Sequence, residues 1–229
     1  TDTAEQGKSE SRSLIESWHG KGRNRYVITP RFAISCSTEQ LIAAGRLHEQ
    51  YPGTYIQTHL SENKDEIDST LSLCPDCQDY LEVYERARLV TDRSIFGHCI
   101  HLSDSECRRL VEAGSVVAHC PTSNLFLGSG LFDMQQANRV GMQTVLATDI
   151  GAGTSFSMLR TMGEAYKVQQ LGGYPMSVFE SLYKCTLGAA KALHLDDEIG
   201  CFGKGRKADF LVMDYAATPS QQVRMDYLK

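Results

Sequence analysis

The sequence predicts an α/β fold, built as a layered sheet or as part of a barrel, from two observations. Short apolar runs rich in β-branched or aromatic residues recur along the chain, and segments of helical pattern lie between them. Such βα units make neighbouring strands parallel and place the helices on the outer side of the sheet. The expected strands cover residues 25–29, 54–59, 93–98, 115–119 and 144–149.

Helix start and stop signals separate these strands. A serine followed three residues later by glutamine or glutamate has the spacing of a capping box, in which each side chain bonds the other residue's backbone N–H. The spacing occurs at Ser37 with Gln40, Ser103 with Glu106 and Ser177 with Glu180, while Gly114 and Gly141 are expected to end helices. Further helices are expected near 9–18, 156–171 and 177–193, and a last strand at 209–213.

Composition and charge exclude several classes of protein. The 229 residues are 41% hydrophobic and 22% charged, which is typical of a folded chain with a substantial core. The net charge of -5 comes without a basic stripe, so nucleic acid is not an expected partner. No apolar run approaches the roughly 20 residues that cross a bilayer, and the N-terminal residues lack signal-peptide features, so we expect a cytoplasmic protein without a membrane partner.

The eight cysteines are expected to be free thiols, because a chain of this size needs no disulfide staples. Cys74 and Cys77 form a C-x-x-C pair, a spacing that serves zinc binding or redox chemistry elsewhere. No second cysteine pair accompanies them, so a surface loop is the favoured interpretation and a metal role is the alternative.

Each expected strand ends in or just before a residue that can do chemistry. These residues are Arg31, His59, His98, His119 and Asp149. Active sites of parallel α/β folds form at the carboxyl ends of the strands, so the shared position favours a common site. For any one of the histidines, the alternative is a hydrogen-bonded structural residue at a strand end.

The residue types favour a metal centre with an acid–base group beside it. Imidazole nitrogen and carboxylate oxygen are normal zinc ligands, which suits His59 and Asp149. Glu62 follows His59 by three residues and is either a proton carrier for water at that metal or a solvated carboxylate in the first turn of a helix. His98 is expected to orient or polarise water or substrate.

Two further positions leave alternatives open. Arg31 next to Phe32 offers a planar fork of donors beside an aromatic ring, which suits a flat heteroaromatic ligand with a carbonyl, although a surface ion pair is the simpler alternative. His119 opens the stretch HCPTSNLFLGSG, which is expected to form a specially shaped loop, and the histidine either lines the site or braces that loop.

Several motifs together resemble the guanine deaminases of the amidohydrolase superfamily, most closely the bacterial type. They are TPRF, QTHLSEN, FGHCIHLS, AHCPTSNLFLGSGLFD and ATDIGAGTSFSMLR, and the resemblance extends from about Tyr26 to Asp214. It implies a partial (β/α)₈ TIM-like barrel with a short C-terminal return towards a small β-sandwich. The expected division is a polar helical segment at 1–24, about five βα units of the barrel at 25–195 and the returning extension at 196–229.

The resemblance also implies roles for the candidate residues. His59 and Asp149 match metal ligands, Glu62 matches a proton shuttle, and His98 matches the histidine beside the activated water. Glu62, His98 and Asp149 are thus the expected catalytic residues, and Arg31, Phe32, Glu62 and His98 the expected contacts to guanine. The implied reaction is zinc-dependent hydrolysis of guanine to xanthine and ammonia in a homodimer, with iron as an alternative to zinc.

One departure from the family pattern is large. The family has an H-x-H pair at the end of the first barrel strand, and no H-x-H occurs in these 229 residues. A complete barrel typically takes about 250 residues, so we expect a C-terminal portion of a longer protein, inactive in isolation because two metal ligands are missing. The alternatives are an amidohydrolase for another amino- or chloro-substituted heterocycle, or a non-catalytic half-barrel.

Overall fold

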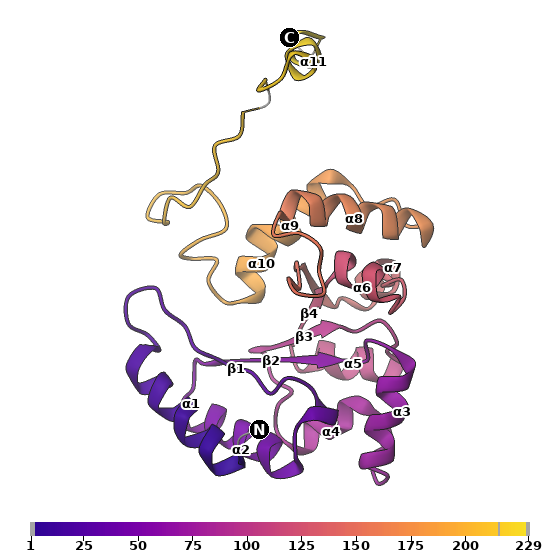
Figure 1. Ribbon diagram of the computed structural model, residues 1–229. Coiled ribbons are helices and arrows are strands. Elements are labelled where there is room, and N and C mark those ends of the chain that lie inside the picture. The colour runs from indigo at the N-terminus through magenta and orange to yellow at the C-terminus, as the bar shows by residue number, and fades with distance from the viewer. Residues whose placement is uncertain (1–2, 215, 228–229) are drawn as a thin grey trace.

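The computed structural model describes residues 3–214 and 216–227 and contains one parallel sheet. Its strands follow each other in the order β1-β2-β3-β4-β5, and each crossover returns the chain to the same direction (Figure 1). The strands are β1 Val27–Ile28, β2 Tyr55–Leu60, β3 Ser94–His98, β4 Val116–His119 and β5 Gln143–Leu146. The five predicted strands are confirmed.

The strand order identifies the architecture as part of a barrel. A doubly wound sheet reverses its order at a switch point, whereas here every strand pairs with its predecessor and its successor along the chain. The register sets His59 beside Gly97 and Leu60 beside His98, so the carboxyl ends of β2 and β3 lie level. Figure 1 shows α1 to α4 on one side of the strands and α8 to α10 on the other side of the molecule.

The predicted capping residues begin helices as expected. Ser37 and Ser103 form complete capping boxes with Gln40 and Glu106, and the Ser177 hydroxyl accepts from the backbone N–H of Glu180. The helices are α1 Ala4–Trp18, α2 Thr38–Gln50, α3 Lys64–Leu73, α4 Tyr80–Arg86, α5 Asp104–Glu112, α6 Pro121–Leu127, α7 Met134–Val140, α8 Met158–Leu171, α9 Val178–Cys185, α10 Leu187–Ala192 and α11 Pro219–Tyr227, with a short 3₁₀ turn, η1, at Ala33–Ser35.

The main core lies between the strands and their helices. Strands β2 to β5 contribute buried residues to it, among them Ile56, Phe96 and Val117, which are completely buried. Burying a side chain of this size stabilises the fold by about 1.5–3 kcal/mol relative to exposing it. A smaller cluster of Ile15 and Leu47 with Ile28 fastens α1 and α2 to the first strand.

Three expectations about local structure are wrong. Strand β5 ends at Leu146 instead of Asp149, so the aspartate lies in the following loop. The helix expected at 177–193 is broken at Thr186, whose backbone (φ -128°, ψ -104°) leaves the helical region. The loop expected after His119 contains α6, because Pro121 occupies the first helical turn, where its missing N–H costs nothing.

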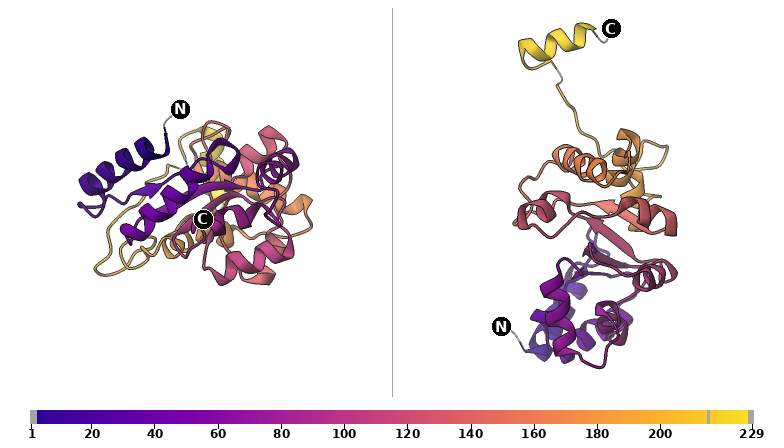
Figure 2. Two further views of the ribbon diagram at one scale, coloured as in Figure 1. Left: turned by 90° about the horizontal axis from the view of Figure 1, so that it is seen from below. Right: turned by 90° about the vertical axis from the view of Figure 1, so that its right-hand side faces the viewer.

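The C-terminal segment differs from the expected strand at 209–213. This stretch has no strand partner among the described residues, and Leu211 and Val212 are 83% and 87% exposed. An apolar run becomes a strand only when a neighbour satisfies its backbone groups, which the sequence pattern cannot supply. Beyond it, α11 lies away from the sheet and buries none of its residues (Figure 2). Among the described residues, no helix is long and apolar enough to span a membrane.

Candidate metal centre and acid–base site

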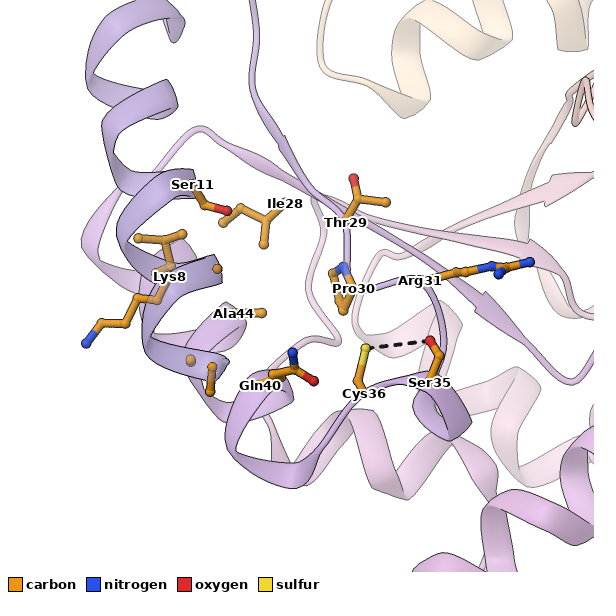
Figure 3. Close-up of a pocket in the computed structure, with 14 residues that line it drawn as sticks. Lys8, Ser11, Ile28, Thr29, Pro30, Arg31, Ser35, Cys36, Gln40 and Ala44 are labelled. Atoms are coloured by element: carbon orange, nitrogen blue, oxygen red, sulfur yellow. Dashed lines mark hydrogen bonds between the residues drawn. The ribbon is translucent and has the colours of Figure 1, made fainter. Parts of the chain in front are cut away.

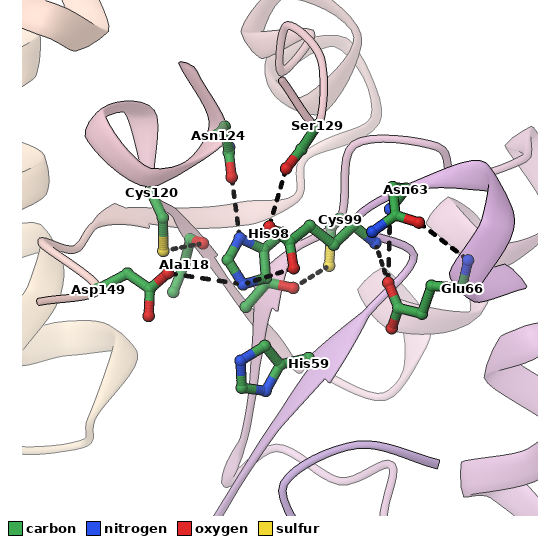
Figure 4. A network of polar contacts seen from close by, with 12 residues as sticks. His59, Asn63, Glu66, His98, Cys99, Ala118, Cys120, Asn124, Ser129 and Asp149 are labelled. Carbon is green, nitrogen blue, oxygen red and sulfur yellow. Dashed lines mark hydrogen bonds and ion pairs between the residues drawn. The ribbon is translucent and has the colours of Figure 1, made fainter. Parts of the chain in front are cut away.

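The carboxyl ends of the strands bring three potential metal ligands together. One donor atom each of His59, His98 and Asp149 lies within 4.8 Å of the others. His59 and His98 come from neighbouring strands, and Asp149 follows β5 by three residues. Figure 4 shows the three side chains converging from separate elements. Of the predicted strand-end residues, these three share the metal-ligand cluster.

A hydrogen bond to the preceding strand loop fixes the ring of His59. Its Nδ1 lies 2.7 Å from the backbone carbonyl of Arg31, and its backbone N–H donates to the same oxygen at 3.1 Å. Because a carbonyl can only accept, Nδ1 carries the hydrogen and Nε2 keeps a free lone pair. This arrangement, a histidine tied through one nitrogen and open at the other, is typical of metal-ligating histidines.

The backbone turns His98 away from the face that strand alternation would give it. His98 shares parity with Phe96, which faces the core, yet its φ is +70° and that of Cys99 is +51°. The left-handed backbone redirects the imidazole to the strand ends, where only 2% of the side chain is exposed. Its Nδ1 lies 2.8 Å from Asn124 Oδ1, donating to it. Its Nε2 lies 3.7 Å from Glu62 and 3.9 Å from Asp149.

Glu62 lies just before α3 and points into the cluster. Asn63 is the N-cap, and the acidic residues of the first turn are Asp65 and Glu66, so the interpretation of Glu62 as a first-turn carboxylate is wrong. Its backbone N–H donates to Glu66 Oε2 at 2.9 Å, and its Oε1 accepts from Ser129 at 2.8 Å. Only 14% of the side chain is exposed, and the two hydrogen bonds hold its backbone and one carboxylate oxygen.

A buried network supports the site from beneath. The Tyr80 hydroxyl donates to Glu66 Oε1 at 2.8 Å, and the Tyr84 hydroxyl donates to the His59 carbonyl at 2.8 Å while accepting from the Ala33 backbone N–H at 3.0 Å. Burial raises the pKa of both tyrosines, so they remain neutral hydrogen-bond donors. The network joins the loop after β1 to the end of β2 and so fixes the backbone of the histidine.

Asp149 depends on a tight turn of its own. Its φ is +46°, and its backbone carbonyl accepts from the Gly153 N–H at 2.6 Å. A Cβ at Gly153 would lie 1.7 Å from the Thr148 carbonyl oxygen, so only glycine fits there. Nearby, burial raises the pKa of the Cys120 thiol to about 12, which keeps it protonated beside the carboxylate.

Arg31 and Phe32 lie at the rim of the site. The Arg31 guanidinium is 5.1 Å from the centre of the Phe32 ring, which in turn lies 5.6 Å from the His59 ring. The backbone of Arg31 also borders a cavity of about 250 Å³ between α1 and α2, where Lys8 and Gln40 form part of the wall. The Arg31 side chain extends away from these two residues (Figure 3).

His119 braces the helix layer and does not belong to the metal-ligand cluster. It follows the alternation of β4, shares the face of Val117, and stacks on Phe132 with ring centres 4.8 Å apart. It is completely buried, and neither ring nitrogen has a hydrogen-bond partner among the described residues. Burial and the charge of Lys184 lower its pKa to about 3, so it is neutral.

The cysteines are free thiols, as predicted. Cys74 and Cys77 lie in the turn that follows α3, with the Cys77 N–H donating to the Cys74 carbonyl at 3.0 Å. This turn lies at the surface, as predicted, with Pro75 and Asp76 exposed, while the two half-buried cysteines pack against the main core. Burial raises the pKa of Cys77, so its thiol is the favoured form.

The sequence-based interpretation missed two residues that contact the site. Asn124 and Ser129 both come from the stretch that was expected to be a loop, and they are 1% and 7% exposed. The signal for Asn124 was the polar run of residues 122–124 after Pro121, which is buried, whereas Ser129 follows four exposed residues and had no such signal. Polar side chains buried in a helix need partners, and here the partners are His98 and Glu62.

The donor set suits a divalent transition metal. Two imidazole nitrogens and one carboxylate oxygen are ligands that zinc and iron both accept, and His59 presents a free lone pair. Glu62 lies beside this set without being required as a ligand, which leaves its carboxylate able to exchange protons. The arrangement can therefore combine a metal with an acid–base group.

Comparisons with known proteins agree with this geometry. The family model "Amidohydrolase family" matches residues 2–227. The chain is 53% identical over 225 residues to "Guanine deaminase" of Escherichia coli strain K12, covering 98% of this chain and 51% of that protein. The "E. coli Guanine Deaminase" structure aligns over 99% of this chain and 53% of its own, with a TM-score of 0.96 and 53% identity.

A second solved structure was determined with a ligand. It is the guanine deaminase from C. acetobutylicum "with bound guanine in the active site", with a TM-score of 0.83 and 30% identity over 90% of this chain and 50% of that one. The chain spans about half the length of the curated relatives it matches.

Proposed function

The chain belongs to the amidohydrolase family, and from that premise we propose that a full-length protein carrying these residues hydrolyses guanine to xanthine and ammonia. The observation that carries the proposal is the placement of Glu62 beside the cluster of His59, His98 and Asp149, in a chain 53% identical to a guanine deaminase. Zinc would be held by His59 and Asp149, with His98 beside them and further ligands from an H-x-H that these residues do not contain. When bound, zinc supplies a Lewis acid that makes water nucleophilic near neutral pH.

Glu62 is the proposed proton carrier. Its carboxylate takes a proton from the attacking water and delivers it to a ring nitrogen of the purine, which removes the aromatic stabilisation that opposes attack. Its position supports this role, because one oxygen faces His98 at 3.7 Å and the other is held by Ser129. General acid–base transfer of this kind typically contributes about 10²–10⁴ in rate.

Asp149 and His98 complete the proposed acid–base set. Asp149 accepts the proton of the newly added hydroxyl group as the carbonyl forms and passes it to the amino group, which leaves as ammonia when the C–N bond breaks, and His98 stabilises charge at the carbon under attack. The 3.9 Å between His98 Nε2 and Asp149 Oδ2 supports a shared task. On the substrate side, Phe32 offers a flat face to the purine and the Arg31 guanidinium offers donors for its carbonyl oxygen.

The experiment is the Glu62→Ala substitution in the full-length protein, assayed for ammonia release with guanine, adenine and a chlorotriazine. We expect loss of at least about 100-fold in turnover with guanine and no change in zinc content by mass spectrometry, because the residue moves protons without holding the metal. Glu112→Ala, on the exposed end of α5, is the matched control and keeps full activity. Near-normal turnover by Glu62→Ala contradicts the assigned role, and preference for another heterocycle contradicts the substrate.

A further inference from the structure

Ser129 holds Glu62 from the end of α6. The helix ends at Gly128, whose φ of +71° permits the left-handed turn that aims the next residue back at the site. The Ser129 backbone N–H then donates to the Asn124 carbonyl at 2.9 Å, and its hydroxyl donates to Glu62 Oε1 at 2.8 Å. Figure 4 shows Ser129 and Asn124 above His98. The helix and its C-terminal end therefore reach both Glu62 and His98, since Asn124 contacts His98 through its side chain.

The Ser129 side chain is separable from the backbone that carries it. The Ser129 carbonyl accepts from His101 Nε2 at 2.9 Å, and its N–H is bonded to Asn124, so both backbone groups have partners without the hydroxyl. Gly130 packs so tightly that a Cβ there would lie 2.8 Å from the Ile100 side chain, which further fixes the loop. Removing only the hydroxyl leaves these restraints in place.

Glu62 has an alternative direction in which to point. It lines an open groove of about 620 Å³ whose wall also includes Lys64, Asp65, His101 and Ser129. Solvent and the exposed ammonium of Lys64 on this side compete with His98 for the carboxylate. The hydrogen bond from Ser129 to Oε1 opposes that rotation, and with Oε1 held, Oε2 remains 3.7 Å from His98.

We propose that Ser129 is a positioning residue for the reaction, one that keeps the Glu62 carboxylate turned towards His98 and away from the Lys64 side of the groove. The kinetic consequence rests on the proposed deaminase function, but the contact itself does not. A hydrogen bond to a charged group is among the stronger ones, so its loss should populate the groove-facing conformation substantially.

The kinetic test compares Ser129→Ala with Ser129→Thr in the full-length protein. We expect Ser129→Ala to lower kcat for guanine about 10-fold, with zinc content unchanged and a smaller change in KM, because the direction of the carboxylate matters most for the proton transfers of the reaction. Ser129→Thr keeps a hydroxyl and restores most of the rate. The control is Ser105→Ala on the exposed face of α5, which retains normal kinetics. A raised KM with unchanged kcat, or no rescue by threonine, overturns the proposal.

A second measurement tests the contact in the 229-residue chain without any activity. Thermal unfolding is followed for Ser129→Ala, Glu62→Ala and the double variant. The sum of the two single shifts in Tm should differ from the shift of the double variant by about 2–4 °C, because the residues interact. Strict additivity overturns the proposal. If the Tm shifts are coupled but the full-length protein does not deaminate guanine, the proposed function is wrong and the Ser129–Glu62 contact is still supported.

Discussion

His98 and His119 end neighbouring strands and are both almost completely buried, yet their surroundings have little in common. His98 has a left-handed backbone, bonds Asn124 through Nδ1 and turns Nε2 towards two carboxylates. His119 keeps the extended strand, stacks on Phe132 and bonds nothing through either nitrogen. A histidine at a strand end is therefore an ambiguous signal. The backbone φ angle of that residue decides whether its ring faces the metal-ligand cluster or packs towards the helices.

The same difference separates two kinds of stability. The surroundings of His98 are polar and connected, because Glu62, Asn124 and Ser129 each bond through side chains. The surroundings of His119 combine packing against the Phe132 ring with the nearby charge of Lys184, and among the described residues no hydrogen bond holds its ring nitrogens. A polar network specifies the direction of each group, whereas an aromatic stack tolerates a change of chemistry if the shape is kept.

Matched substitutions of the two histidines should have the largest effect. In the full-length protein we expect His98→Leu to lower kcat/KM for guanine by about 10²–10⁴, since it removes a group that faces both carboxylates. His119→Leu should stay within about threefold of the unchanged protein, because leucine keeps the apolar contact with Phe132. Circular dichroism verifies that both variants fold. Equal losses of activity would show that the two histidines are not distinguished by their surroundings.

The Asn124→Ala substitution should leave Nδ1 of His98 without its hydrogen-bond acceptor. A buried nitrogen that loses its acceptor costs about 1–3 kcal/mol, so we expect urea unfolding of the 229-residue chain to show a loss of that size. Asn138→Ala is the matched control, because Asn138 is exposed on α7 and bonds Tyr174 at the surface. Its cost should be below about 1 kcal/mol, since water replaces the lost bond. Equal losses of unfolding free energy in the two variants would show that burial does not strengthen the contribution of the His98–Asn124 hydrogen bond.

The contrast also explains what the sequence could predict. Strand positions follow from short apolar runs, and the sequence predicted that His59 and Glu62 lie together at the metal-ligand cluster. Alternation along β4 places His119 on the same face as Val117, towards the helices. The strand pattern could therefore have decided between a histidine that lines the site and one that braces the neighbouring segment. The same rule applied to His98 would place it wrongly, because nothing local in the sequence announces the positive φ.

Other features depend on contacts that no local pattern contains. Asn124 and Ser129 act through partners 26 and 67 residues away in the chain, so their roles need the folded sheet. The run at 209–213 has strand composition, but strand formation needs a neighbour, and the described residues provide none. Local signals therefore predicted elements well and predicted their partners poorly.

The pH dependence of unfolding should isolate the contribution of His119 to the comparison. Its pKa is about 3 in the folded chain against 6.5 for an unperturbed histidine, because burial and the nearby charges of Lys184 and His98 oppose protonation. The unfolded chain thus binds the proton more readily, and the free energy of unfolding falls as pH drops below 6.5. At pH 5 the loss of unfolding free energy from this residue should be about 2 kcal/mol.

His119→Leu removes the titrating group. Urea unfolding at pH 7.5 and pH 5 should therefore give a smaller decrease in the free energy of unfolding for that variant than for the unchanged chain. Because all other groups titrate in both proteins, the difference between the two decreases belongs to His119. Identical decreases would mean that its ring nitrogens exchange protons as freely in the folded chain as in the unfolded one, and the buried, unpartnered environment would then be wrong.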